Sequence, residues 1–176
     1  ITFARHGHEA VFLGNISHDP AGAAVVKVLD REGVDTSYIN FLERKTTGTS
    51  VVLLDSKSGE RTILTCRGAS EQFGNFDEKD LDLIQPDWLY ATTLRGDMET
   101  LRRFFVYAKK LGVKIMFNPG VKELANATEL TGLLKYVDVL NVNKAEAAQI
   151  VPGVVLTELL YHLNNLVPTA IITDSA

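Results

Sequence analysis

The chain has 176 residues, of which 45% are hydrophobic and 23% charged, and its formal net charge is -4. This composition is typical of a soluble globular chain with one good-sized core. The negative charge, without any stripe of lysine and arginine, argues against a nucleic-acid partner. No apolar run approaches the roughly 18–20 residues that cross a bilayer, so no membrane partner is expected. The single cysteine, Cys66, excludes an internal disulfide and is compatible with the cytoplasmic location that we predict.

The first 66 residues combine one helix with several β patterns. A strand is predicted at 10–14, and Asp19-Pro20 begins a helix because aspartate caps helices and proline favours their first turn. Three further strands are predicted at 36–41, 49–54 and 61–66. The intervening DSKSGE is a hairpin turn in which glycine supplies the positive φ. We expect residues 36–66 to form a small antiparallel sheet that stands off the main one.

From residue 77 onward helices and strands alternate. Asp77 and Asp97 are each predicted to cap a helix, and the second helix has an apolar face with the helical period. That face comprises Leu101, Phe104, Phe105, Ala108 and Leu111. Apolar strands are predicted at 88–91, 113–117, 137–142 and 169–173, and we expect helices to cover both of their faces. The alternation predicts an α/β fold with a parallel sheet and right-handed crossovers.

Polar residues follow each of these four strands. The clusters are Thr92 to Gly96, Asn118 to Gly120, Asn143 with Glu146, and Asp174-Ser175. In an open α/β sheet, ligands bind beyond the carboxyl ends of the strands. The sequence therefore predicts a binding site at this edge, although loops are polar in any protein.

Asn143 and Glu146 allow two interpretations. An asparagine followed three residues later by glutamate is a capping box, which contributes about 1 kcal/mol and occurs in many helices without a site. A helix N-terminus at the edge of a parallel sheet also attracts anions, and a carboxylate there can hold a magnesium-bound water. The two roles are compatible.

A second interpretation of the function depends on Arg5-His6-Gly7. This tripeptide resembles that of the histidine phosphatases, in which the histidine is phosphorylated, and the alternative function is therefore a phosphatase that uses His6. Such a site needs a second histidine and further arginines at the same edge. The sequence contains no P-loop, no dinucleotide fingerprint and no cluster of residues at metal-ligand spacing.

Several motifs, in this order, resemble those of the PfkB (ribokinase-like) family of carbohydrate and nucleoside kinases. Gly14, Asp19 and Gly22 match its glycine-aspartate-glycine turn, and residues 46–70 look like the strands around its lid and the RGA segment that follows. FNPG at 117–120 resembles its D/N-P motif, VLNVNKAEA at 139–147 its N-x-x-E motif, and AIITDSA its nucleotide-binding strand end. The resemblance covers nearly the whole chain. It implies a ribokinase-like parallel sheet with an antiparallel β lid at 36–66, all within one partial domain of residues 1–176.

The resemblance also implies the roles of individual residues. Asn143 and Glu146 would organise Mg²⁺ and the phosphates of ATP, and Thr173 would lie beside the nucleotide. Arg67 and Asn118 would lie near the sugar or the phosphates. Two positions depart from the family pattern, because Ser175 replaces a glycine and Asn118 stands where many members have aspartate.

Two family motifs are not found in these residues. We expect the glycine pair and asparagine that grip the substrate to precede Ile1, and the GAGD loop with the aspartate general base to follow Ala176. The 176 residues alone are therefore expected to be inactive, while the whole protein would phosphorylate a sugar or nucleoside. The β lid would cover the substrate and could join two copies in a homodimer. The alternative within the family is a non-catalytic protein that binds a sugar or nucleotide.

Overall fold

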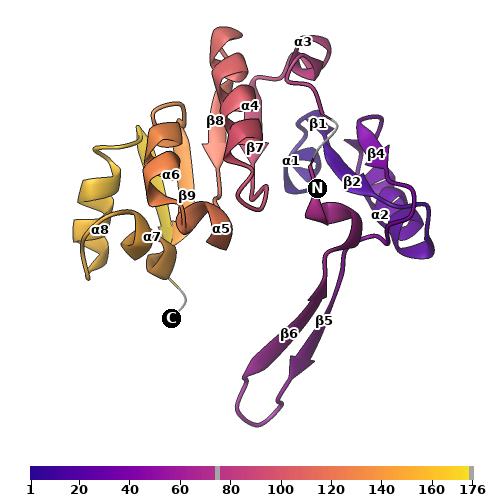
Figure 1. Cartoon of the computed structure of the whole chain (residues 1–176), viewed down its shortest axis with the longest axis horizontal. Helices are drawn as coiled ribbons and strands as arrows, with labels where there is room; N and C mark the ends of the chain where they lie inside the picture. Colours follow the sequence, from indigo (N-terminus) through magenta and orange to yellow (C-terminus); the bar gives the residue numbers. More distant parts are fainter. Residues whose placement is uncertain (74–75, 175–176) are drawn as a thin grey trace. The chain divides into compact units, whose positions relative to one another are not determined.

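The computed structural model describes residues 1–73 and 76–174, which divide into two compact units (Figure 1). Unit 1 runs from Ile1 to Phe76, and unit 2 begins at Asp77. Within the described residues, no helix has the length and apolar character that a bilayer crossing requires.

Unit 1 combines short paired strands with two α-helices and one 3-10 helix. Its elements are α1 (Thr2–Arg5), β1 (Ala10–Val11), β2 (Gly14–Ile16), α2 (Pro20–Arg31), β3 (Val34–Asp35), β4 (Ile39–Phe41), β5 (Thr49–Leu54), β6 (Arg61–Cys66) and the 3-10 helix η1 (Gly68–Glu71). β1 pairs with β3 and β2 with β4, both in parallel, whereas β5 and β6 are antiparallel. The core of the unit comprises Ile16, Leu29, Val34 and Ile39.

Two predictions for this unit need correction. The strand expected at 10–14 is divided between β1 and β2, which pair with different partners. The strand expected at 36–41 is limited to β4 and lies beside β2 rather than in the antiparallel sheet. The burial of Ile39 in the same core as Ile16 favours this pairing, because it places the apolar side chains of β4 and β2 out of water together.

The predicted helix cap at Asp19 is confirmed, and it also anchors the chain that leads into β5. Asp19 Oδ1 accepts hydrogen bonds from the Gly22 N–H (2.8 Å) and the Thr47 hydroxyl (2.7 Å), and Oδ2 accepts from the Thr47 N–H (2.8 Å). The Thr47 donors hold the pKa of Asp19 below its usual value. Gly22 is required here, because a Cβ would lie 2.2 Å from the carbonyl oxygen of Ser17.

β5 and β6 form a ribbon that extends away from the rest of unit 1 (Figure 1). Its six large apolar side chains are between 54% and 67% exposed. Since side chains alternate along a strand and paired residues share a face, both faces of the ribbon are apolar. One face carries Val51, Leu53 and Leu64, and the other carries Val52, Leu54 and Ile63. A two-stranded ribbon is marginally stable by itself, so these faces are suited to contacts with other groups.

Glu32, directly after α2, ties that helix to α1 and should contribute to the acid stability of unit 1. It accepts from Arg5 Nε (2.5 Å) and Nη2 (2.8 Å), and these bonds lower the pKa of Glu32 from 4.5 to about 2. A lowered carboxyl pKa stabilises the fold above pH 4.5, and this stabilisation is lost as the pH falls toward 2.

We expect Glu32→Gln to make the unfolding temperature depend less on pH between these values, as measured by thermal unfolding from pH 7 to pH 2. Glu60→Gln, in the exposed β5–β6 turn, is the control, and equal profiles for the two variants would contradict the assignment.

Unit 2 is built on a parallel four-stranded sheet. Its elements are α3 (Asp80–Ile84), β7 (Trp88–Ala91), α4 (Met98–Lys110), β8 (Lys114–Phe117), α5 (Val121–Leu124), α6 (Ala127–Leu134), β9 (Val139–Asn143), α7 (Lys144–Ile150), α8 (Leu156–Leu163) and β10 (Thr169–Thr173). The strand order is β10-β9-β8-β7, and every pair is parallel. The predicted α/β sheet is therefore confirmed.

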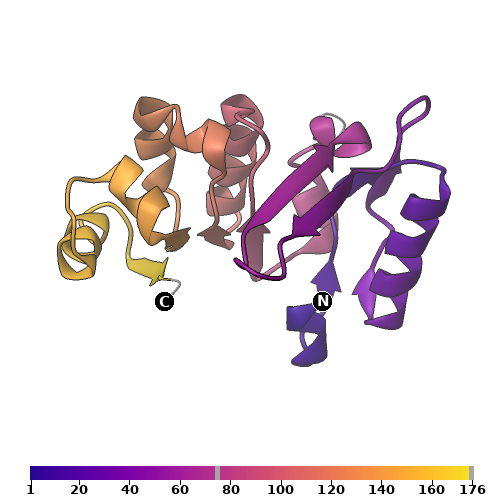
Figure 2. The same cartoon turned by 90° about the horizontal axis from the view of Figure 1, so that it is seen from below.

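Helices α4 to α7 of unit 2 lie on one side of this sheet (Figure 2). The sheet face beneath them is buried, and Ile115, Phe117 and Leu140 are completely inaccessible there. The opposite face carries Trp88 and Tyr90, which are 48% and 47% exposed. The predicted parallel sheet with flanking helices is confirmed, but within the described part of unit 2 the helices cover only one of its faces. The apolar residues of a strand indicate that a sheet face can be buried. Which element covers that face depends on the rest of the fold.

The helix ends of unit 2 follow the sequence signals in part. Asp97 caps α4 as predicted, since its Oδ1 accepts from the Thr100 N–H at 3.0 Å. Gly112 ends the segment after α4 with a φ of 78°. Asp77 does not cap α3, which begins at Asp80. Asp77 instead accepts from the Lys79 N–H (2.9 Å) and forms a turn ahead of that helix.

Candidate functional site

The polar clusters of unit 2 meet at one edge of the sheet. Because all four strands are parallel, their carboxyl ends point the same way. Thr173 and Asn143 are directly paired in the register of β10 and β9, at the last position of each strand. We call this edge, with residues 92–96, 118–120, 143–146 and 173–174, the strand-end site. The predicted Ser175 lies outside the described residues.

Asn143 and Glu146 form the predicted capping box. The Asn143 N–H donates to Glu146 Oε2 at 2.8 Å, and the Glu146 N–H donates to Asn143 Oδ1 at 2.9 Å. The capping role is therefore confirmed. Glu146 is partly exposed, and its Oε1 has no hydrogen-bond partner within the part of the chain that the structure describes. One carboxylate oxygen thus remains able to bind a further group.

Asn118 is held between two strands. Its backbone N–H donates to the carbonyl oxygen of Ala91, and its side-chain Nδ2 donates to that of Asn141 (2.7 Å). The amide plane is therefore fixed close to the end of β9. This contact leaves the side-chain oxygen of Asn118 without a partner among residues 1–73 and 76–174, so it can accept a hydrogen bond from a ligand.

A lysine that the sequence did not single out lies at the same edge. Lys144 Nζ is 3.7 Å from Asp174 Oδ2, and both side chains are 44% exposed. A pair this exposed contributes little to stability. It nevertheless places a cation next to Asn143, where an anionic ligand would gain from it. No sequence signal distinguishes Lys144 from other helix-start lysines.

A second residue that the sequence missed is Glu123, in the first turn of α5. Its side chain is completely buried and accepts four hydrogen bonds from residues that follow β7 and β8. In the sequence Glu123 is one of many glutamates, and its position three residues after Gly120 indicates only that a helix begins there. Its partners become visible only when the two loops lie side by side.

The remaining predicted residues lie in unit 1. Arg67 precedes η1 and is exposed, and its guanidinium makes no hydrogen bond or ion pair within the described ranges. His6 directly follows α1, a helix, rather than a strand end, and its Nδ1 lies 2.8 Å from the carbonyl oxygen of Thr2. Its neighbour Arg5 is bound by Glu32. The arrangement that a phosphohistidine site needs is therefore not formed around His6.

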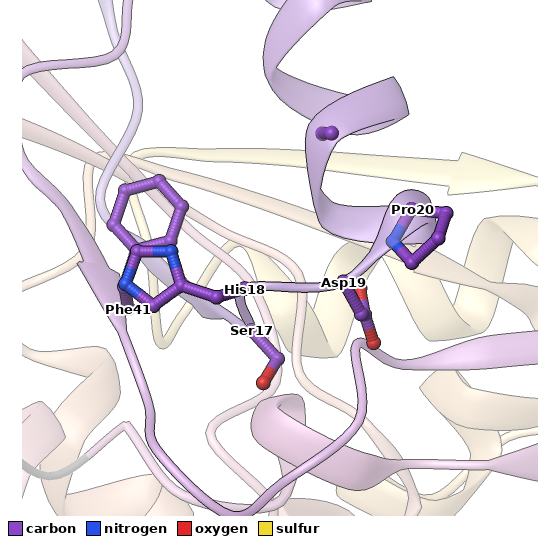
Figure 3. A pocket seen from close by; sticks show the side chains of 6 residues that line it. Ser17, His18, Asp19, Pro20 and Phe41 are labelled. Atoms are coloured by element: carbon purple, nitrogen blue, oxygen red, sulfur yellow. The ribbon is translucent and has the colours of Figure 1, made fainter.

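A shallow hollow of about 380 Å³ lies at the start of α2 (Figure 3). The imidazole of His18 stacks on the ring of Phe41, with ring centres 4.5 Å apart. Both carboxylate oxygens of Asp19 already bond the backbone or Thr47, so the hollow offers little polar chemistry. None of the predicted site residues lines it.

Magnesium fits the strand-end site in one way only. The described residues contain no group of three or more metal-binding side chains, so a cage made of protein ligands is not formed there. Mg²⁺ commonly keeps several waters and binds through one or two carboxylates together with substrate phosphates. Glu146, with its unpartnered Oε1, suits that mode of binding.

Comparison with known proteins shows the family to which the chain belongs. The family model described as pfkB family carbohydrate kinase matches residues 1–175. The ribokinase of Haemophilus influenzae is 27% identical over 156 residues, which cover 88% of this chain and 49% of that protein. The chain thus spans about half the length of this curated relative.

Two solved structures share the fold. The Burkholderia thailandensis nucleoside kinase in complex with inosine has a TM-score of 0.76 at 17% identity, covering 98% of this chain and 56% of that one. An E. coli protein described as a candidate ribokinase II, in complex with ATP and Mg²⁺, has a TM-score of 0.75 at 16% identity, covering 96% and 57%. With the family match over residues 1–175 and the ribokinase-like sheet, the chain belongs to the PfkB family of carbohydrate kinases.

Proposed function

We propose that the whole protein transfers the γ-phosphoryl group of ATP to a hydroxyl of a sugar or nucleoside. The observation that carries this proposal is the strand-end site, where Asn118, Asn143, Glu146 and Thr173 are gathered at one edge of a parallel sheet. The family match supports the reaction class, and the relative with bound ATP and Mg²⁺ supports the choice of donor.

Each residue has a proposed part in positioning the reactants. Asn143 and Glu146 organise the phosphates of ATP, with Glu146 Oε1 holding a water of the metal. Thr173 lies beside the nucleotide, and Arg67 and Asn118 contact the sugar or the phosphates. When bound, Mg²⁺ would neutralise charge on the phosphates. Phosphoryl transfer depends on such positioning and electrostatic stabilisation, and the general base is proposed to lie after Ala176.

The β5–β6 ribbon is proposed to serve as the lid, within residues 36–66, and as a dimer contact. Because both of its faces are apolar and exposed, one can cover the substrate while the other meets a second copy of the protein. We expect sedimentation of the whole protein to show a dimer, and Leu53→Asp and Leu54→Asp to differ in their effect because they alter opposite faces. A dimer that survives both substitutions would contradict the ribbon contact.

The test of the function is a coupled assay of the whole protein with ATP, Mg²⁺ and a panel of sugars and nucleosides. Turnover with at least one acceptor is the expected result. Nucleotide binding without turnover of any acceptor, measured by calorimetry, would instead support a non-catalytic binding protein.

A further inference from the structure

The carboxylate of Glu123 joins two loops of the strand-end site. Oε1 accepts from the backbone N–H groups of Leu94 (2.9 Å) and Gly96 (2.7 Å). Oε2 accepts from the Thr93 hydroxyl (2.7 Å) and the Gly120 N–H (3.1 Å). All four partners donate, so the carboxylate acts only as an acceptor and both of its oxygens are fully used. The loop after β7 and the turn after β8 are thereby held as one body.

The two loops are closely packed beside this carboxylate. A Cβ on Gly120 would lie 2.6 Å from Cβ and from Oγ1 of Thr93, so the two loops touch at a position that only glycine allows. Glu123 itself has no exposed surface. A carboxylate without a cation partner that is buried this deeply is costly unless hydrogen bonds satisfy it, and here the two loops supply them.

The loop that Glu123 holds contains a strained residue. Arg95 has a φ of 61°, in the left-handed region that a side chain other than glycine's rarely adopts, and Gly96 follows with a φ of 82°. Such strain persists only where the surroundings enforce it, and it is concentrated at functional sites. Glu123 enforces it through the N–H groups of Leu94 and Gly96, the residues on either side of Arg95.

Arg95 is half-buried in the loop that follows β7. Its guanidinium makes no hydrogen bond or ion pair with any residue of the ranges 1–73 and 76–174. A planar guanidinium donates five hydrogen bonds in a rigid fork, and its geometry matches phosphate and carboxylate oxygens. An arginine that is held in a strained conformation but lacks a protein partner is therefore available for an anionic ligand.

We propose that Glu123 is a positioning residue that fixes Arg95 to bind an anionic group of a reactant. The inference rests on the proposed kinase function and adds to it a residue pair that the family motifs do not contain. The anionic group is either a phosphate of ATP or a phosphate or carboxylate on the acceptor. These sources share one chemistry, and the dependence of KM on the acceptor's charge separates them.

Two substitutions at Glu123 test the fixing of the loop. Glu123→Gln keeps the shape but turns one acceptor oxygen into an NH₂ group, which cannot accept a hydrogen bond. If the NH₂ group replaces Oε2, the Gly120 N–H is left unmatched. If it replaces Oε1, the two N–H groups after β7 are left unmatched. We expect it to lower kcat/KM roughly tenfold, the effect of one unmatched buried donor. Glu123→Ala leaves all four donors unmatched, and we expect a loss of about 10²-fold, typical of a displaced site.

The matched control is Asp138→Asn, at the opposite edge of the same sheet. Asp138 is also a partly buried carboxylate that accepts a backbone bond, from the Ile115 N–H (2.7 Å), and it pairs with Lys109. We expect Asp138→Asn to lower the unfolding temperature while kcat/KM at 25 °C stays within about twofold of wild type. If both variants lower kcat/KM in proportion to their loss of stability, Glu123 is merely structural and the proposal fails.

Coupling between the two residues is the most specific test. If Glu123 acts through Arg95, then Arg95→Ala in the Glu123→Ala background should cause no further loss of kcat/KM, whereas independent effects would multiply. Arg95→Lys should be as impaired as Arg95→Ala, because an ammonium lacks the planar fork of donors that a guanidinium has. If the losses of kcat/KM caused by Glu123→Ala and Arg95→Ala multiply in the double variant, the proposal is overturned.

The KM values of the Arg95 variants identify the anion. A rise in KM for ATP assigns the anion to ATP, and a rise in KM confined to phosphorylated or carboxylated acceptors assigns it to the acceptor.

Hydrogen exchange of the whole protein separates this inference from the proposed function. We expect Glu123→Ala to speed exchange of the Leu94, Gly96 and Gly120 amides by at least tenfold relative to those of β9, without any need for turnover. Unchanged exchange at these amides would refute the role of Glu123 even in an active kinase. If the wild-type protein shows no turnover while Glu123→Ala still speeds exchange at these amides, the proposed function is refuted, but the loop clamp, that is, the joining of the two loops by Glu123, is established.

Discussion

Replacing Glu146 by alanine is expected to lower kcat/KM of the whole protein by about 10²-fold, the usual cost of losing a group that orients a metal or its water. The same change removes half of a capping box and should lower the free energy of unfolding by only about 1 kcal/mol. The reason for the difference is that Oε2 accepts the hydrogen bond of the capping box, whereas Oε1 accepts none from the described residues. Steady-state kinetics over a range of Mg²⁺ concentrations, with thermal unfolding in parallel, measure both effects.

The control for this variant is Glu158→Ala. Glu158 also lies in the first turn of a helix and accepts one backbone bond, from the Val154 N–H at 3.1 Å, but it does not follow a strand. We expect a similar small loss of stability and unchanged kinetics. Full activity of Glu146→Ala, or equal kinetic losses in the two variants, would contradict the metal role of Glu146. Glu146→Gln then separates charge from capping, since an amide oxygen can still accept the Asn143 N–H.

The second large effect is expected at Phe105, in the buried face of α4. Phe105 has no exposed surface and packs edge-to-face on Phe117 of β8, with ring centres 5.3 Å apart at 82°. We expect Phe105→Ala to lower the free energy of unfolding by about 3–5 kcal/mol, since it removes the buried ring and leaves a cavity. Denaturant unfolding followed by circular dichroism measures this change.

Leu111→Ala provides the comparison. The helical spacing places Leu111 on the same apolar face as Phe105, but the structure shows it at the end of α4 and 44% exposed. We therefore expect its substitution to cost less than about 1 kcal/mol. Equal losses at the two positions would show that α4 packs differently from the structure described.

The local features of the fold, and part of the strand-end site, could be predicted from the sequence. Helical and strand periods depend on neighbouring residues, and so do the caps at Asp19, Asp97 and Asn143, which the structure confirms. The alternation of these elements also predicts a parallel sheet whose carboxyl ends share an edge. Family motifs added the identities of the residues at that edge, but their roles as ligands remain predictions.

Tertiary structure alone decided which distant groups meet. The sequence could not show that β4 pairs with β2, that the helices of unit 2 cover only one face of its sheet in the described residues, or that Asp77 does not cap α3. Nor could the sequence distinguish Glu123 from other glutamates, because its role depends on hydrogen-bond donors 27 to 30 residues earlier in the chain. A hydrogen bond between such residues depends on how two crossover units pack. Local periodicity carries no record of that packing, which is why the loop clamp appears only in three dimensions.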